Sequence, residues 1–243
     1  IRDVERSRGL GDVYKRQADI ILGNKDKSKI VEILNDFIRD RESKKIIYDL
    51  SSVEFEKMEI SHFDNHTRAF VKIQDGCNAF CSYCIIPYTR GRVRSKNKED
   101  VIEEVSRLAR DGYKEIVLTG IHTGRYGIDI NSSLYELLCE LVKIPNIYRI
   151  RLSSIEINEV TPEIIDLYKN NKIMARHLHV PLQSGSNKIL KLMNRRYNKE
   201  EFMKMIDKLR EIEDISLTTD LIVGFPNETD DDFEAVSYTH LRA

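Results

Sequence analysis

The chain has 243 residues, a formal net charge of −1, and a composition that is 41% hydrophobic and 33% charged. That length suffices for one large domain or two small ones with a sizeable core. No apolar run approaches the roughly 18 residues that a membrane-spanning helix needs, and we recognise no signal peptide. We therefore expect a cytoplasmic protein with no membrane partner.

Both ends of the sequence lack helical or strand periodicity. Residues 1–17 and 236–243 resemble translated adapter sequence, and we expect them to be non-native segments. The pattern over 18–39 predicts a short strand, a turn at Gly23 and Asn24, and an amphipathic helix. Residues 40–67 are highly charged and predict a linker that contains one strand at 44–50.

Predicted strands alternate with predicted helices in the rest of the chain. The strands lie at 69–73, 115–121, 148–154, 176–183 and 215–225. The helices lie at 98–112, 133–144, 161–171, 198–212 and 227–235. Such alternation predicts βα units around a parallel sheet. We therefore expect an α/β fold, a partial and open βα barrel that is truncated before its last unit, with a doubly wound sheet as the alternative.

The strand at 176–183 has two chemically different faces. Because side chains alternate along a strand, Leu178, Val180 and Leu182 point one way, while His177, His179 and Gln183 point the other. A parallel strand that is buried on both faces is usually apolar throughout. The polar face therefore predicts a lumen that binds a ligand; an ordinary sheet with one solvated face is the alternative.

Three of the four cysteines, Cys77, Cys81 and Cys84, follow the first of these strands closely. In a reducing compartment such a group indicates metal binding or catalysis rather than disulfides. A structural zinc site takes four ligands, usually in two pairs, and no partner pair follows here. Cys139 lies on the apolar face of a predicted helix, where we expect it to pack as a small hydrophobic residue. Three thiolates suit an iron–sulfur cubane whose fourth iron stays open to a substrate.

The spacing C-x3-C-x2-C resembles the signature of the radical S-adenosylmethionine (SAM) enzymes, and the resemblance covers residues 18 to about 235. It implies a 4Fe–4S cluster on the three cysteines, SAM at the open iron, and a low-potential electron donor of unknown identity. An electron from the cluster would cleave SAM to a 5′-deoxyadenosyl radical. The family's usual Gly-Gly-Glu motif appears here as "TGIHTG" at 119–124. By position, the resemblance places six more residues at SAM: Tyr83, Thr119, Gly120, Glu156, Gln183 and Gly224.

Further motifs resemble the methylthiotransferase branch of that family, among them "RLSSIE", "HLHVPLQSGSNKILKLMNRRY" and "TDLIVGFPNET". Within the branch, "GYKEIVLTGIHTG" is most similar to the tRNA enzyme that acts on N6-threonylcarbamoyladenosine beside the anticodon. The resemblance implies hydrogen abstraction from C2 of the adenine, followed by insertion of sulfur and of a methyl group from a second SAM. Related branches act on isopentenyladenosine in tRNA or on a ribosomal protein, and these are the alternative substrates.

The resemblance also implies a domain organisation. Residues 18–66 would be the remnant of an N-terminal methylthiotransferase domain with its linker, and 67–235 would be an incomplete radical SAM core. The full-length family holds a second 4Fe–4S cluster, which we do not expect in this chain.

Two stretches, 85–98 and 188–199, carry several basic residues and no acidic ones. Phosphate contacts need such local positive charge, so we expect tRNA to contact Arg90, Arg92, Arg94 and Lys96. Arg195 or Arg196 could instead meet the SAM carboxylate, because a guanidinium group suits that geometry. A merely solvated charged face and a zinc-binding, RNA-binding module without catalysis are the remaining alternatives.

Overall fold

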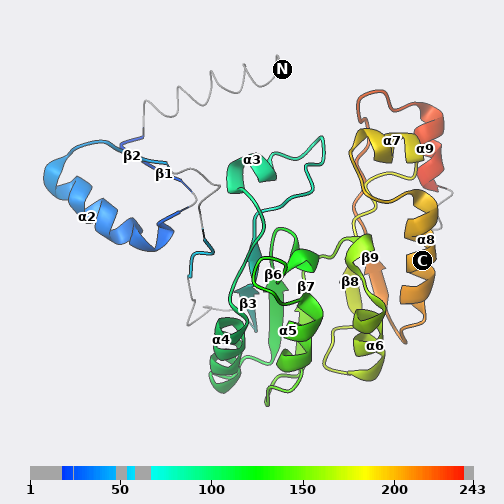
Figure 1. Ribbon diagram of the computed structural model, residues 1–243, viewed down its shortest axis with the longest axis horizontal. Helices are drawn as coiled ribbons and strands as arrows, with labels where there is room; N and C mark the ends of the chain where they lie inside the picture. Colours follow the sequence, from blue (N-terminus) through cyan, green and yellow to red (C-terminus); the bar gives the residue numbers. More distant parts are fainter. Residues whose placement is uncertain (1–17, 24, 48–53, 58–66, 238–243) are drawn as a thin grey trace. The chain divides into compact units, whose positions relative to one another are not determined.

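Figure 1 presents a computed structural model of the chain, which describes residues 18–23, 25–47, 54–57 and 67–237. The chain divides into two compact units, Ile1–Met58 and Glu59–Ala243. The expected non-native segment 1–17 lies outside the described residues, as do Asn24 of the predicted turn and residues 238–243. Residues 236 and 237 continue the last helix rather than starting an irregular segment.

The first unit contains a parallel strand pair with a helix between the strands. β1 (Ile20–Leu22) pairs with β2 (Lys44–Ile46), and α2 (Ile30–Asp40) connects them after a short turn, η1 (Lys27–Lys29). Parallel strands need such a crossover, because a two-residue turn can join only antiparallel neighbours. The predicted order of strand, helix and strand is therefore confirmed for the described residues, while residues 48–50 of the second predicted strand lie outside them.

The second unit is built on parallel strands at positions that the sequence pattern predicts. β3 (Arg68–Lys72), β6 (Glu115–Thr119) and β7 (Arg149–Leu152) form one sheet in chain order. β8 (His177–His179) pairs with β9 (Ser216–Thr218), also in parallel. A single bridge between Ile150 and Met174 joins β7 to the segment that enters β8. The open βα arrangement is confirmed, and the described strands do not close into a barrel.

Helices alternate with these strands (Figure 1). The predicted ones are α4 (Lys98–Arg110), α5 (Leu134–Leu141), α6 (Pro162–Asn170), α8 (Lys199–Arg210) and α9 (Asp230–Ser237). Side chains of Asn97, Ser133, Thr161 and Asn198 accept hydrogen bonds from first-turn N–H groups and so fix where four helices begin. Of the helices that the structure describes, none has both the length and the apolar character needed to cross a bilayer.

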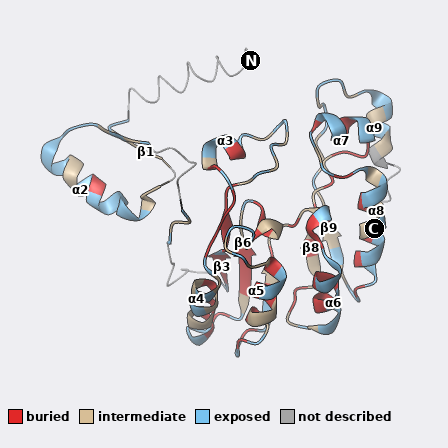
Figure 2. Cartoon of the chain, in the orientation of Figure 1, coloured by how far each residue is buried: buried red, intermediate tan, exposed pale blue. Residues whose placement is uncertain are grey.

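The apolar face of the sheet packs on the helices. Val71, Leu118 and Leu152 come from the β3–β6–β7 sheet and Leu178 from β8, and all four are completely buried. Figure 2 shows buried residues in β3, β6, β7 and β8, and α4, α5, α6 and α8 each contribute buried apolar side chains. The opposite face is polar on β7, which carries Arg149 and Arg151, and on β8, which carries two half-buried histidines, whereas β3 and β6 place Phe70 and Val117 there.

Several predicted elements are shorter than expected or were not foreseen. The predicted strand at 176–183 shrinks to three residues, because Pro181 lacks an N–H donor and Gln183 has a left-handed backbone with a φ of 71°. Pairing resumes only as a single bridge from Gln183 to Leu221. The short helices α3 (Ile86–Arg90) and α7 (Asn187–Leu192) had no recognisable period. The two-residue strands β4 (Gln74–Asp75) and β5 (Arg94–Ser95) had none either.

Candidate cofactor site

The three clustered cysteines lie on the loop that leaves the carboxyl end of β3 and leads into α3. β4 and β5 pair as antiparallel strands at the base of this loop. The amide of Cys77 also donates to the carbonyl of Gly91, over 3.1 Å. The loop therefore starts and ends at one fixed point, at the edge of the sheet where βα proteins place their chemistry.

Gln74 ties the cysteine loop to the loop that follows β6. Its side chain is completely buried and donates to the carbonyls of Asp75 and Gly76, each over 2.7 Å. Its Oε1 accepts from the amide of His122, over 2.7 Å. A Cβ on Gly120 would come within about 3.0 Å of the Gln74 side chain, so Gly120 allows the close approach of the two loops.

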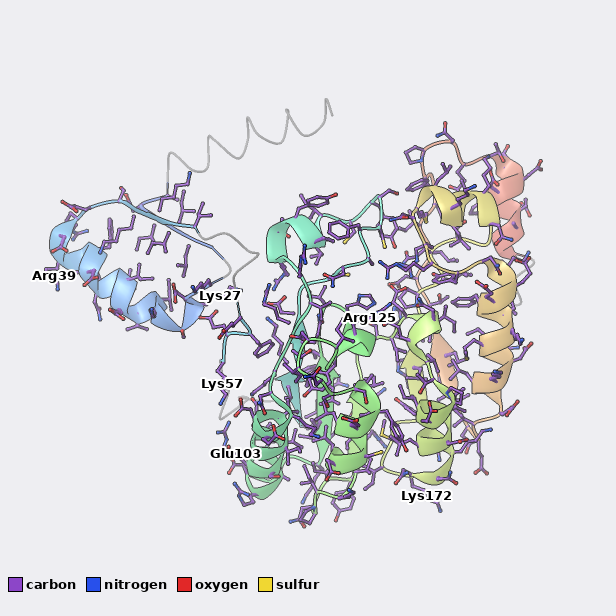
Figure 3. The ribbon with its side chains drawn as sticks, in the orientation of Figure 1. Lys27, Arg39, Lys57, Glu103, Arg125 and Lys172 are labelled. Carbon is purple, nitrogen blue, oxygen red and sulfur yellow. The ribbon has the colours of Figure 1, made fainter. Side chains whose placement is uncertain are left out.

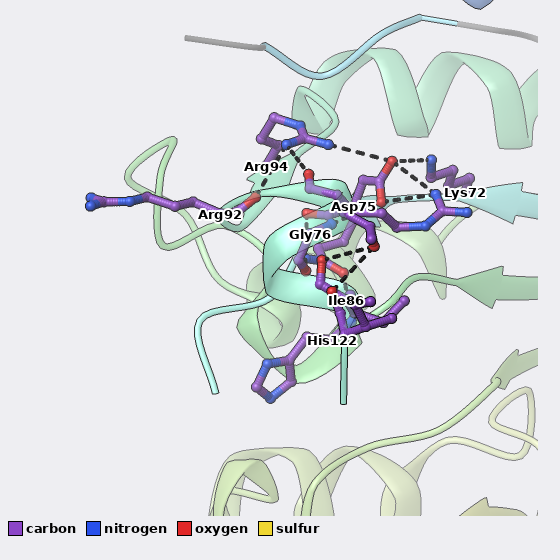
Figure 4. A network of polar contacts seen from close by, with 11 residues as sticks. Lys72, Asp75, Gly76, Ile86, Arg92, Arg94 and His122 are labelled. Atoms are coloured by element: carbon purple, nitrogen blue, oxygen red, sulfur yellow. Dashed lines mark hydrogen bonds and ion pairs between the residues drawn. The ribbon is translucent and has the colours of Figure 1, made fainter. Parts of the chain in front are cut away.

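Asp75 gathers three cations around the start of the loop (Figure 4). Its carboxylate lies 2.6 Å from Lys72, 3.3 Å from Arg90 and 3.6 Å from Arg94. Burial raises the pKa of Asp75, but the hydrogen bond and the charge of Lys72, with help from Arg90, outweigh burial and leave the pKa below its usual value. These basic side chains therefore stabilise the loop from inside.

This burial corrects the expectation that the basic run 90–96 as a whole faces RNA. Arg94 is 7% exposed, and its guanidinium donates to the carbonyl of Arg90. Lys96 is 2% exposed and lies 2.5 Å from the carboxylate of Glu104 on α4. Neither side chain can reach a phosphate in this conformation. Arg90 is half-buried against Asp75, whereas Arg92 is exposed, and RNA contact by these two residues stays a prediction.

Cys77 contacts a histidine that sequence reasoning did not single out. Its Sγ lies 3.2 Å from Nδ1 of His122, and the other ring nitrogen, Nε2, lies 2.8 Å from Glu159. Arg125 donates to the same carboxylate oxygen, over 2.6 Å. Figure 3 shows Arg125 at the carboxyl ends of the strands. Burial raises the pKa of the Cys77 thiol, but the hydrogen bond from His122 lowers it, and the net pKa is below its usual value.

The contacts that lower the pKa of Cys77 raise the pKa of His122. Burial lowers its pKa, but hydrogen bonds to Cys77 and Glu159 outweigh burial and raise the pKa to about 10. The only sequence signal for this residue was its position in "TGIHTG", where the family usually has Gly-Gly-Glu.

Cys81 contacts Arg195, which follows α7. Nη1 of Arg195 lies 3.4 Å from Cys81 Sγ and 3.3 Å from the hydroxyl of Tyr83, while Nη2 pairs with the carboxylate of Glu156. Burial raises the pKa of Tyr83, and the charge of Arg195 only partly offsets this effect. Cys84 is half-buried, and its amide donates to the carbonyl of Cys81, over 3.0 Å.

A pocket of about 540 Å³ opens beside the cysteine loop. It is lined by Ser82, Tyr83, Leu192, Ile222, Gly224, Phe225, Pro226 and Asn227. Small-molecule sites have this size and this largely apolar lining. The structure thus brings together Tyr83 and Gly224, two residues that the resemblance places at SAM although they are far apart in the sequence.

The other four predicted SAM residues do not line this pocket. Glu156 lines a smaller depression together with Cys81 and Arg195. The hydroxyl of Thr119 points back toward the carbonyl of Val71. Gly120 packs on Gln74. The backbone of Gln183 bonds to Asp220 and Ile222, which positions the segment that carries Gly224. Their contact with SAM stays a prediction.

The three thiols of the loop suit an iron–sulfur cubane, in which each thiolate binds a separate iron. Cys77 and Cys81 also each face a donor that suits the thiolate form. Cys139 lies on α5 and packs against the core, as expected.

The sequence profile of the Radical SAM superfamily matches residues 71–237, and the chain therefore belongs to this superfamily. Members use a 4Fe–4S cluster and SAM, and membership makes these the cofactors of this chain. A solved radical SAM methyltransferase, TsrM from Kitasatospora setae, has a cobalamin and a [4Fe-4S] cluster bound. It superposes with a TM-score of 0.56 at 19% identity, over 68% of this chain and 32% of its own. The cobalamin-dependent radical enzyme OxsB, with SAM bound, superposes with a TM-score of 0.57 at 14% identity, over 68% of this chain and 25% of its own. These likenesses show the shared fold.

The sequence comparisons confirm the resemblance to methylthiotransferases. The chain is 40% identical to the threonylcarbamoyladenosine tRNA methylthiotransferase MtaB of Aquifex aeolicus, over 93% of this chain and 58% of that protein. It is 44% identical to MtaB of Thermotoga maritima, over 89% and 50%. It is 41% identical to the tRNA-2-methylthio-N(6)-dimethylallyladenosine synthase of Acetivibrio thermocellus, over 88% and 45%. The chain spans about half the length of the curated relatives it matches.

Proposed function

We propose that this chain is part of a radical SAM methylthiotransferase that modifies C2 of N6-threonylcarbamoyladenosine in tRNA. The observation that carries the proposal is the cysteine loop beside a pocket lined by Tyr83 and Gly224, in a chain 40–44% identical to enzymes named for this reaction. We further propose that residues 18–66 are the remnant of an N-terminal domain and that 67–235 are the catalytic core.

The residues of the site would have separate roles in binding the cluster and SAM. Cys77, Cys81 and Cys84 would hold a 4Fe–4S cluster, which supplies the electron for SAM cleavage and one open iron for SAM. The apolar pocket would take the adenine, with Tyr83 and Gly224 at its wall. Glu156 would face the polar end of SAM, because its carboxylate lies on the side of Cys81. The electron would come from a low-potential donor of unknown identity.

tRNA is the proposed partner because exposed cations surround the site. Arg92 is exposed, and Arg196 is exposed with its guanidinium held on the carbonyl of Asn78, over 2.9 Å. Such side chains supply the sequence-independent phosphate contacts of an RNA-binding surface. They would place the anticodon arm near the cysteine loop, while the nucleoside itself enters the site.

A second candidate substrate is dimethylallyladenosine in tRNA. The synthases that act on it are 41–44% identical to this chain, which is close to the identity of the MtaB relatives. The two substrates share the adenine and its C2–H bond and differ in the group on N6. The residues that contact that group would decide between the candidates.

Deuterium transfer tests the reaction and the substrate together. The chain is reconstituted anaerobically with iron and sulfide, then given dithionite, SAM and tRNA deuterated at C2 of the target adenine. We expect deuterium to appear in 5′-deoxyadenosine with threonylcarbamoyladenosine tRNA, and less with dimethylallyladenosine tRNA or unmodified tRNA. Cys84→Ala is the control without SAM cleavage. A preference for dimethylallyladenosine tRNA would favour the second candidate, and 5′-deoxyadenosine without deuterium from any tRNA would overturn the proposal.

A further inference from the structure

One short turn carries two carboxylates that face the cysteine loop. The turn is η4 (Ile157–Glu159), which follows β7, and Glu156 immediately precedes it. Glu156 pairs with Arg195, and Glu159 pairs with His122 and Arg125. A Cβ on Gly124 would overlap the Glu159 carboxylate, so the missing side chain at Gly124 leaves room for this carboxylate.

Each carboxylate holds a donor that contacts a different thiol. His122 Nδ1 lies 3.2 Å from Cys77 Sγ, and Arg195 Nη1 lies 3.4 Å from Cys81 Sγ. The two donors come from separate parts of the chain, the loop after β6 and the segment after α7. Two parallel series of contacts thus run from one turn, through two donors, to two of the three predicted cluster ligands.

In both series of contacts, the chemistry of the groups fixes which one donates a hydrogen bond and which one accepts it. A carboxylate and a thiolate are both acceptors, so each ring nitrogen of the histidine between them faces an acceptor: Nδ1 lies 3.2 Å from Cys77 Sγ, and Nε2 forms an ion pair with Glu159 rather than an aligned hydrogen bond. A guanidinium can only donate. The side chains of His122, Glu159 and Arg195 are 9%, 6% and 3% exposed, and hydrogen bonds are electrostatically stronger in such a water-poor setting than in bulk water. The donors are therefore already oriented toward the sulfurs.

We infer that the Glu156–Glu159 turn sets the reduction potential of the cluster, by holding His122 and Arg195 as hydrogen-bond donors to two of its thiolates. The inference rests on cluster binding by the three cysteines, as in the proposed function. A cluster that accepts one electron gains one negative charge, which donors to its sulfurs stabilise, so the potential rises. The electron comes from the same external low-potential donor, and the turn determines how readily the cluster accepts it.

The test is a reductive titration of the reconstituted chain without SAM, with the reduced cluster followed by EPR and iron counted per chain. His122→Phe removes both donors and keeps a ring of similar size. His122→Asn places an amide N–H near the position of Nδ1 and so restores the bond to Cys77. Glu159→Gln keeps the shape and removes the charge that orients His122. His177→Phe is the control, because this histidine contacts Thr218 on β9 and not the cysteine loop.

We expect His122→Phe to shift the one-electron reduction equilibrium at least tenfold toward the oxidised cluster, which corresponds to about 59 mV. Glu159→Gln should shift it less in the same direction, and His122→Asn should recover most of the difference. Arg195→Met should also lower the potential, because it removes the donor to Cys81. The control should keep the potential of the unaltered chain.

The outcomes separate the inference from the proposed function. Full iron with an unchanged potential in His122→Phe and Arg195→Met would overturn the inference and leave the proposed function standing. If His122→Phe fails to hold a cluster, the reduction potentials of Glu159→Gln and His122→Asn decide the question. Potentials in both variants that equal that of the unaltered chain would overturn the inference. If the unaltered chain assembles no cluster, the proposed function and the inference both fail.

Discussion

Gly76 lies so close to Arg92 that a Cβ on Gly76 would overlap the Arg92 carbonyl group. Gly76 also has a φ of +72°, in the left-handed region that favours glycine. The residue lies between Asp75, which gathers the cations of the loop, and Cys77, the first predicted ligand. Both strands at the base of the cysteine loop therefore approach each other only because position 76 has no side chain.

Gly76→Ala should destabilise the fold and reduce cluster binding together. The left-handed backbone alone costs about 1–2 kcal/mol for an alanine, and the overlap with Arg92 adds to this cost. Gly112→Ala is a matched control, because Gly112 has a φ of +99° but a methyl group added there would have no neighbour within 4 Å among the described residues. Thermal unfolding and iron content should fall more for Gly76→Ala. Equal losses in the two variants would show that the close approach to Arg92 is unimportant.

Lys96 should be required for stability rather than for RNA binding. Its ammonium group and the Glu104 carboxylate form a buried pair over 2.5 Å. Lys96→Met leaves the carboxylate buried without its partner, and breaking such a pair costs about 3–5 kcal/mol. Lys96→Met combined with Glu104→Leu should recover most of that loss, as measured by urea unfolding. If Lys96→Met alone unfolds like the unaltered chain, the buried pair does not contribute to stability.

The sequence pattern predicted the long elements well, because each has an apolar face with a clear period. Val71 and Leu178 lie on the buried sides of their strands, where alternation places them. The sequence pattern did not predict the short helices α3 and α7, because five or six residues contain too few turns to show a period. Spacing alone predicts the three cysteines as cluster ligands, since this chemistry depends on local distances along the chain, and that assignment stays a prediction.

The rest of the site depends on contacts that no local pattern records. His122 and Glu159 follow different strands, and they meet only because β6 and β7 are neighbours in the sheet. The charge of Lys96 was visible in the sequence, but its partner on α4 was not. A run of basic residues therefore predicted a solvated surface where the structure has a buried ion pair.

Acid should weaken the fold partly through Glu115, at the opposite end of the sheet from the cysteine loop. Burial raises the pKa of Glu115, but the hydrogen bond and charge of Arg151, with Arg149, outweigh burial and lower the pKa below its usual value. A lowered pKa gives stability that is fully present above the unfolded-state pKa of about 4.3 and is lost as pH falls through the folded-state pKa. Urea midpoints between neutral pH and about pH 3 should therefore fall less steeply in Glu115→Gln. Parallel profiles would exclude this contribution.

The cluster should need Cys77, Cys81 and Cys84 but not Cys139. Cys139 is partly buried on α5 against the core, whereas the other three thiols lie on one loop. Alanine at any of the three should remove most of the iron, because each thiolate binds a different iron of the cubane. Cys139→Ala should keep roughly four irons per chain, the content of one cubane cluster. Loss of iron in Cys139→Ala, with folding intact, would mean that the ligand assignment is wrong.

Arg92 should contribute to tRNA affinity through charge alone. It is exposed on the cysteine loop, and a phosphate contact from it would release about one counterion. Arg92→Gln should therefore reduce the slope of log affinity against log salt by about 1, with unchanged thermal stability. Lys172→Gln is the charge-matched control, because Lys172 precedes β8 at the opposite end of the strands (Figure 3). Affinities measured by filter binding at several salt concentrations decide the question: equal slopes for the two variants would mean that the RNA does not lie over this loop.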